Sequence, residues 1–144
     1  MTASLFKRAL FRFHIWLSAK AMPLRVRGRS FENVLKLAPL TTTSTFYDGL
    51  PAAYIARRAV RVARNPWFMR DRQCLRQGLL GSRFLRSAGY DPELVFGVDT
   101  ASIHSDRLSA HCWVCLDGKP VISDSMPGMI VIYRHRAAAQ RARP

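Results

Sequence analysis

The 144-residue sequence is short of acidic residues, and this shortage shapes every reading of its surface. Only 9 Asp and Glu residues accompany 23 Lys and Arg, which gives a net charge of +14. Such charge indicates an acidic polypeptide, a nucleic acid or an anionic membrane surface as partner, although a basic solvated surface would carry it equally well. The arginines come without zinc-finger spacing, an RNA-reading aromatic pair or a glycine-rich phosphate loop. We therefore expect no nucleic-acid partner.

Cysteine is also scarce. Three cysteines are too few for a disulfide framework, so we expect a reducing, cytoplasmic compartment. Cys112 and Cys115 form a C-x-x-C pair, but two ligands are only half a zinc site and no second pair exists. Both lie in a predicted strand, where their odd separation places them on opposite faces. We therefore assign both a structural role and expect neither a metal nor another cofactor.

Long apolar runs are missing as well. The segment from Leu5 to Leu24 is apolar, but basic residues interrupt it throughout, so neither a membrane-spanning helix nor a signal peptide is expected. The pattern predicts an amphipathic helix that packs on the rest of the protein and ends at Pro23. The alternative is that residues 5–24 lie on a membrane surface as a peripheral contact.

The remaining chain reads as several helices followed by a sheet. Apolar spacing predicts a helix from Pro51 to Arg64 and another from Cys74 to the stop at Gly89. Strands follow, including a hairpin around Asp117-Gly118 and an edge strand over residues 129–133. The fold class predicted is α+β, with the cysteine-bearing helix packed on a small antiparallel sheet and a helical N-terminal extension. We divide the chain into a helical part (1–68), a core (69–135) and a basic tail expected to be disordered (136–144).

Cys74 is the candidate nucleophile, because a thiol at a helix N-terminus is stabilised as the thiolate. His111, on the first strand of the hairpin, is the candidate general base, and Trp113 shares its strand face. Asp124, just past the second strand, is the candidate acid. This order of Cys, His and Asp is that of papain-like and transglutaminase-like thiol sites. Asp117 is the less favoured acid, because Asp-Gly turn chemistry already explains it. Each residue alone has a commoner structural role.

Three blocks of the sequence resemble a known family. They are Cys74-Leu75-x-x-x-Leu79-Leu80-x-x-x-Phe84-Leu85-Arg86-x-x-Gly89, then Leu94-Val95-Phe96-Gly97-Val98, then Ala110-His111-x-Trp113-Val114 with Asp117-Gly118-x-Pro120-Val121. In this order and with these gaps they look like the lasso-peptide leader peptidases, the B-type maturation proteases of the transglutaminase-like superfamily.

The resemblance implies a cysteine peptidase that removes the leader from a lasso precursor peptide. The freed core amine is then joined to an Asp or Glu side chain by an ATP-dependent lactam synthetase, so ATP belongs to that partner. The chain looks like the split form of the family, which works with a separate leader-recognition protein. The family's nucleophile and base match Cys74 and His111, and Asp124 is the choice for the acid, although Ser123 occupies the neighbouring position.

Two other functions stay open. The chain could be a non-enzymatic basic binding module for nucleic acid or a membrane surface. It could also be a transglutaminase-like acyltransferase, because an acyl-thioester can pass to an amine or to water.

Overall fold

A computed structural model describes residues 2–36, 46–64 and 72–136 of the chain. Helices and strands follow one another as predicted for an α+β protein, which confirms the fold class. The elements are α1 (Thr2–Val26), α2 (Phe31–Leu35), α3 (Ala52–Ala63), α4 (Gln73–Ser87), β1 (Glu93–Asp99), the short 3-10 helix η2 (Thr100–Ser102), β2 (Ala110–Leu116), β3 (Lys119–Ile122) and β4 (Met129–His135). The proposed boundary at 68/69 and nearly all of the tail lie outside the described residues and stay predictions.

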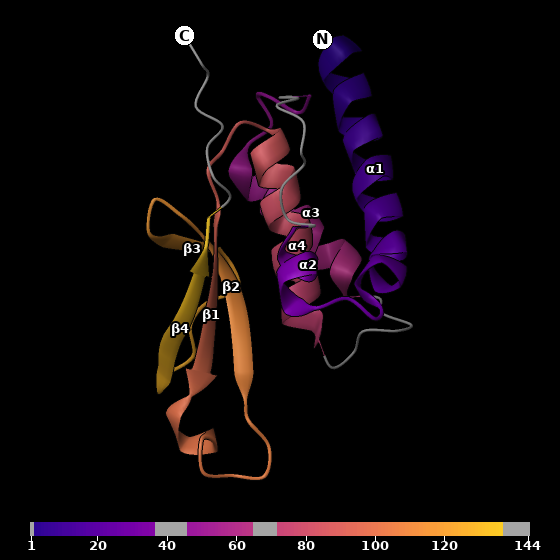
Figure 1. Ribbon diagram of the computed structural model, residues 1–144. Helices are drawn as coiled ribbons and strands as arrows, with labels where there is room; N and C mark the ends of the chain where they lie inside the picture. Colours follow the sequence, from indigo (N-terminus) through magenta and orange to yellow (C-terminus); the bar gives the residue numbers. More distant parts are fainter. Residues whose placement is uncertain (1, 37–45, 65–71, 137–144) are drawn as a thin grey trace, which may run out of the picture.

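The four strands form one antiparallel sheet in the order β3-β2-β1-β4. Helices α3 and α4 lie between this sheet and α1 (Figure 1). The hairpin between β2 and β3 turns at Asp117 and Gly118, which have φ angles of 50° and 77°. Two positive φ values match the tight hairpin turn that the Asp-Gly pair predicts. The predicted edge strand is β4.

Helix α1 packs on the rest of the protein, as predicted. Its buried side chains recur every three or four residues, the spacing of one helix face: Phe11, Ile15, Ala19, Met22 and Val26. A second apolar group remains exposed, including Leu5, Phe6, Phe13, Trp16 and Leu17. Its contact with a membrane surface stays a prediction. Among the described residues, no helix is long and apolar enough to cross a membrane.

The prediction that Pro23 ends α1 is wrong, because the helix continues through it to Val26. Proline has no N–H and so leaves the carbonyl of the residue four positions earlier without its helical partner. That residue is Ala19, and its carbonyl accepts a 2.7 Å hydrogen bond from Arg76 Nη2 of α4. The arginine replaces the missing donor, so the helix can pass the proline.

Arg76 also reaches α3. Its Nη1 donates to the carbonyl of Ala63 at 3.5 Å. Ala63 is the last residue of α3, where carbonyls lack partners within the helix. The side chain is 2 % exposed, so a buried guanidinium joins α1, α3 and the first turn of α4. The N-terminal end of α4 is fixed in place by this contact.

Replacing Arg76 by Met tests the role of this guanidinium. Methionine keeps much of the apolar stem but leaves two buried carbonyls without a donor, so the free energy of unfolding should fall by about 3 kcal/mol. Arg29→Met on the surface is the control and should change little. Urea unfolding followed by circular dichroism measures both.

Pro23→Ala in the same background sharpens the test. Alanine restores the N–H that bonds to the Ala19 carbonyl, so Pro23→Ala should stabilise the Arg76→Met protein more than it stabilises the original one. Strictly additive effects of the two substitutions would contradict the pairing.

Candidate active site

Cys74 is the second residue of α4 and is half-buried. The first N–H groups of a helix have no partner within the helix, and they carry the positive end of its dipole. Arg72 occupies the N-cap position, and its side chain makes no capping hydrogen bond to these groups. The position predicted from sequence, at a helix start, is therefore the one observed.

Strand β2 supplies hydrogen-bond donors to the Cys74 sulfur from Cys112 and His111. The Cys112 thiol is the strongest influence and lowers the pKa of Cys74 by hydrogen bonding. Burial opposes it, and the Cys112 backbone, the His111 side chain and the charge of its imidazole lower the pKa further. The resulting pKa of Cys74 is about 5, so the sulfur is a thiolate at neutral pH.

Cys112 takes the opposite role in this pair. The hydrogen bond to Cys74, its burial and the Cys74 charge all raise the pKa of Cys112, so it keeps its proton and donates a hydrogen bond to the thiolate. Helix α4 permits this approach because it has a glycine one turn after Cys74. A Cβ on Gly78 would lie only 2.7 Å from Leu94 Cδ1 of β1 and 3.4 Å from the Cys112 sulfur, so a larger residue would push the sheet away from α4.

The two cysteines of the C-x-x-C pair lie on opposite faces of the sheet, as predicted. Cys112 belongs to the core under α4, and Cys115 to a smaller cluster with Val95 and Trp113 on the other face. The sequence prediction nevertheless missed the contact between Cys112 and Cys74. The two-residue period of a strand already predicts that Cys112 and Cys115 lie on opposite faces. Only the packing of β2 on α4 shows that Cys112 is the one that faces Cys74.

His111 lies at the start of β2, where it contacts Cys74 and Ser123. Its Nε2 is 2.8 Å from Ser123 Oγ. Its ring stacks against Trp113, with the ring centroids 6.1 Å apart. Ser123 directly follows β3 and has a φ of 58°, a left-handed conformation that is uncommon for serine. The structure thus brings Cys74 and His111 together, with Ser123 at Nε2 of the ring.

The two candidate acids, Asp117 and Asp124, both follow β2 in the chain. Asp124 accepts hydrogen bonds from its neighbour Ser125, from the backbone N–H at 2.7 Å and from the hydroxyl at 3.4 Å. Asp117 sits in the turn after β2, six residues from His111, which is roughly 20 Å along a strand. The role of Asp124 as the acid stays a prediction, and Ser123 occupies the hydrogen-bonding position on the imidazole.

Within the described ranges, no cluster of three or more His, Cys, Asp or Glu residues could hold a metal ion. A thiolate beside an imidazole can attack a carbonyl carbon and transfer its acyl group.

Alkylation of Cys74 tests the hydrogen bond from Cys112. The rate of iodoacetamide reaction should rise with pH through a midpoint of about 5. Cys112→Ala removes a donor that favours the thiolate, so the midpoint should move upward, whereas Cys112→Ser keeps a donor and should move it less. Cys115→Ala, on the other face, is the control. An unchanged midpoint in Cys112→Ala would rule out this hydrogen bond.

Comparison with known proteins agrees with this geometry. A family model described as the transglutaminase-like superfamily matches residues 18–134, which include the end of α1, the cysteine helix and all of the sheet except His135, the last residue of β4. No curated protein and no solved structure matches the chain. Members of this superfamily are typically cysteine-dependent enzymes that need no cofactor. Because the match covers most of the sequence, the chain belongs to the transglutaminase-like superfamily.

Proposed function

We propose that the protein is a cysteine peptidase that removes the leader from a lasso precursor peptide. The observation that carries the proposal is the position of Cys74 at the start of α4, where Cys112 and His111 of β2 lie beside its sulfur and favour the thiolate. The three sequence blocks that resemble the lasso-peptide leader peptidases support the choice of substrate. They contain both Cys74 and His111.

Acylation begins when Cys74 Sγ attacks the carbonyl carbon of the last leader residue. Negative charge develops on the carbonyl oxygen, and the Cys74 backbone N–H is the proposed donor to it. A single donor of this kind contributes about 3 kcal/mol in related enzymes. His111, which carries the proton taken from the Cys74 thiol, gives it to the leaving nitrogen as the C–N bond breaks, and the released amine becomes the N-terminus of the core peptide.

Deacylation returns the enzyme to its starting state. His111, now neutral, takes a proton from water as the water oxygen attacks the thioester carbon. The C–S bond breaks, the leader leaves with a new carboxylate, and Cys74 is again a thiolate. Ser123, through its contact with the imidazole, and Asp124, by its position in the sequence, are the two candidates for orienting the ring.

The partners follow from the same proposal. The precursor peptide would be presented by a separate leader-recognition protein, and the released core would pass to an ATP-dependent lactam synthetase in the reducing cytoplasm. The net charge of +14 suits acidic surfaces on any of these.

Acyl transfer to an amine is the second candidate function. The transglutaminase-like superfamily and the same acyl-thioester support it, and only the acceptor differs. A non-enzymatic binding module is the third, and it would be indifferent to loss of the Cys74 sulfur.

Ser123→Ala and Asp124→Asn identify the residue that orients His111. Losing one hydrogen bond to the imidazole costs about 1.4 kcal/mol, so we expect Ser123→Ala to lower kcat about tenfold. Asp124→Asn should have the smaller effect, because Asp124 bonds to Ser125. Steady-state kinetics of peptide cleavage measures both. The reverse ranking would assign the acid role to Asp124.

Reconstituted cleavage tests the proposed function itself. The full chain is mixed with a lasso precursor peptide and its leader-recognition protein, and the products are weighed by mass spectrometry. We expect a free leader whose mass includes one added water, and an intact core. Activity should fall as the pH drops through about 5, because the Cys74 thiolate is then protonated.

Cys74→Ala is the matched control for cleavage. It should lose all product formation while its circular dichroism spectrum and its binding to the leader-recognition protein are kept. A leader joined to an added amine would favour the acyltransferase. Cleavage that survives in Cys74→Ala would overturn the proposal.

A further inference from the structure

A groove runs along the outer side of α3, where this helix borders β3. Its volume is about 530 Å³. Small apolar side chains line it, among them Ala56, Val60 and Val121. Three arginines stand along it: Arg57, Arg61 and Arg64.

These three arginines form one charged row on the helix. They are spaced four and three residues apart, which places them on one face of α3, and all three are exposed. Like charges at such spacing destabilise a helix. None of the ion pairs seen among the described residues includes them.

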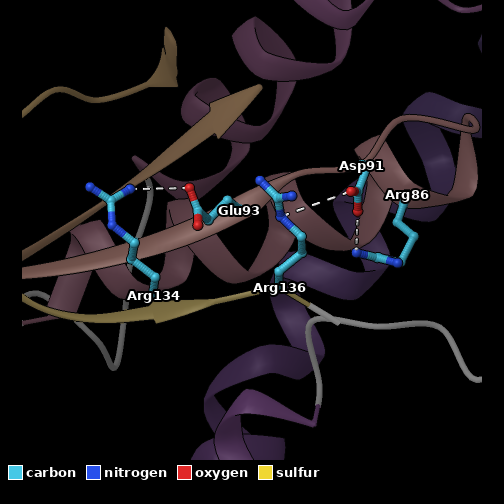
Figure 2. A network of polar contacts seen from close by, with 5 residues as sticks. All are labelled: Arg86, Asp91, Glu93, Arg134 and Arg136. Carbon is cyan, nitrogen blue, oxygen red and sulfur yellow. Dashed lines mark hydrogen bonds and ion pairs between the residues drawn. The ribbon is translucent and has the colours of Figure 1, made fainter. Parts of the chain in front are cut away.

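The acidic residues that do form ion pairs are engaged elsewhere. Asp91 and Glu93 lie at the start of β1, where Arg86, Arg134 and Arg136 bind them (Figure 2). The row on α3 therefore faces solvent as positive charge over an apolar floor.

The walls of the groove connect to the elements of the candidate site. The C-terminal end of α3 adjoins the first turn of α4, because Arg76 bonds to the carbonyl of Ala63. On the other wall, Val121 is two residues before Ser123, which contacts His111. One end of the groove is thus bordered by the elements that connect to the first turn of α4 and to Ser123.

We propose that this groove binds an acidic segment of the peptide substrate, with its carboxylates on the three arginines and its apolar side chains on the floor. A guanidinium can bind a carboxylate through two parallel hydrogen bonds, so arginine suits this task better than lysine. The proposal rests on the proposed function, because it takes the ligand to be the peptide that is cleaved.

The spacing of the arginines defines the segment further. Arg57 and Arg61 are separated by roughly 6 Å along the helix axis. Two residues of an extended peptide span roughly 7 Å and return the side chain to the same side. The groove therefore fits acidic residues at alternate positions, with apolar residues between them facing the floor. The lining residues include no aromatic side chain on which a base could stack, which disfavours single-stranded nucleic acid.

Peptide binding to the Cys74→Ala protein tests the proposal without any need for cleavage. The probe is a fluorescein-labelled decapeptide of alternating Glu and Leu, and its affinity is measured by fluorescence anisotropy at low salt. Arg57→Glu with Arg61→Glu should weaken binding by about tenfold or more, since two carboxylate contacts become repulsive. Arg27→Glu with Arg29→Glu makes the same change in net charge on exposed residues outside the groove, and should change the affinity less than about twofold.

Two further probes make the result decisive. The same decapeptide with Gln for Glu should bind much more weakly, and an oligothymidylate of equal charge should bind no more tightly than the acidic peptide. Equal losses in the two double variants would show only a general charge effect and would overturn the proposal. Tighter binding of the oligothymidylate, lost in the α3 variant, would overturn it in favour of nucleic acid.

Failure of this proposal is separable from failure of the proposed function. If precursor cleavage is seen but the α3 variant binds the acidic decapeptide normally, only the groove proposal fails. If no peptide is cleaved while the α3 variant still loses the decapeptide, the groove stands and the peptidase proposal fails.

Discussion

The position of the nucleophile depends on one buried guanidinium. Arg76 gives hydrogen bonds to two carbonyls that their own helices cannot satisfy, one at Ala19 because of Pro23 and one at the end of α3. Breaking such a buried charged contact is far more costly than losing a surface pair. Arg76 lies two residues after Cys74. The hydrogen bonds that join α4 to α1 and α3 therefore also hold the first turn of α4, which carries Cys74.

The reactivity of the sulfur then depends on how closely β2 approaches that turn. Gly78 lets β1 and β2 pack close to α4, because a Cβ there would clash with the Leu94 side chain of β1 at 2.7 Å and touch the Cys112 sulfur at 3.4 Å. Cys112 and His111 are consecutive residues, so one strand supplies both the donor to the thiolate and the imidazole. A helix dipole, a neighbouring thiol and an imidazole thus act on one atom, and together they outweigh the effect of its burial.

Positive charge is distributed unevenly between two parts of the described surface. At the start of β1, arginines are matched by Asp91 and Glu93, and these pairs fasten the end of β4 to the rest of the sheet (Figure 2). Along α3 the arginines are unmatched by any of the ion pairs seen, and they stand above an apolar floor. An excess of one charge is costly within a folded chain, so its concentration in one row beside the site is the pattern expected of a surface that binds acidic groups.

Local pattern determined much of this protein. Apolar spacing gave α3 and α4, the Asp117-Gly118 pair gave the hairpin, and strand alternation separated Cys112 from Cys115, because these features depend on near neighbours alone. Tertiary structure decided the rest. Arg76 of α4 donates to the Ala19 carbonyl and so lets α1 continue through Pro23, a contact that the local sequence does not predict. The packing of β2 on α4 decides that Cys112 is the partner of Cys74. At Ser123, where the backbone is left-handed, the hydroxyl contacts the imidazole of His111. The next residue, Asp124, accepts a hydrogen bond from Ser125. Such contacts join residues distant in sequence, so their geometry is set only when the elements pack.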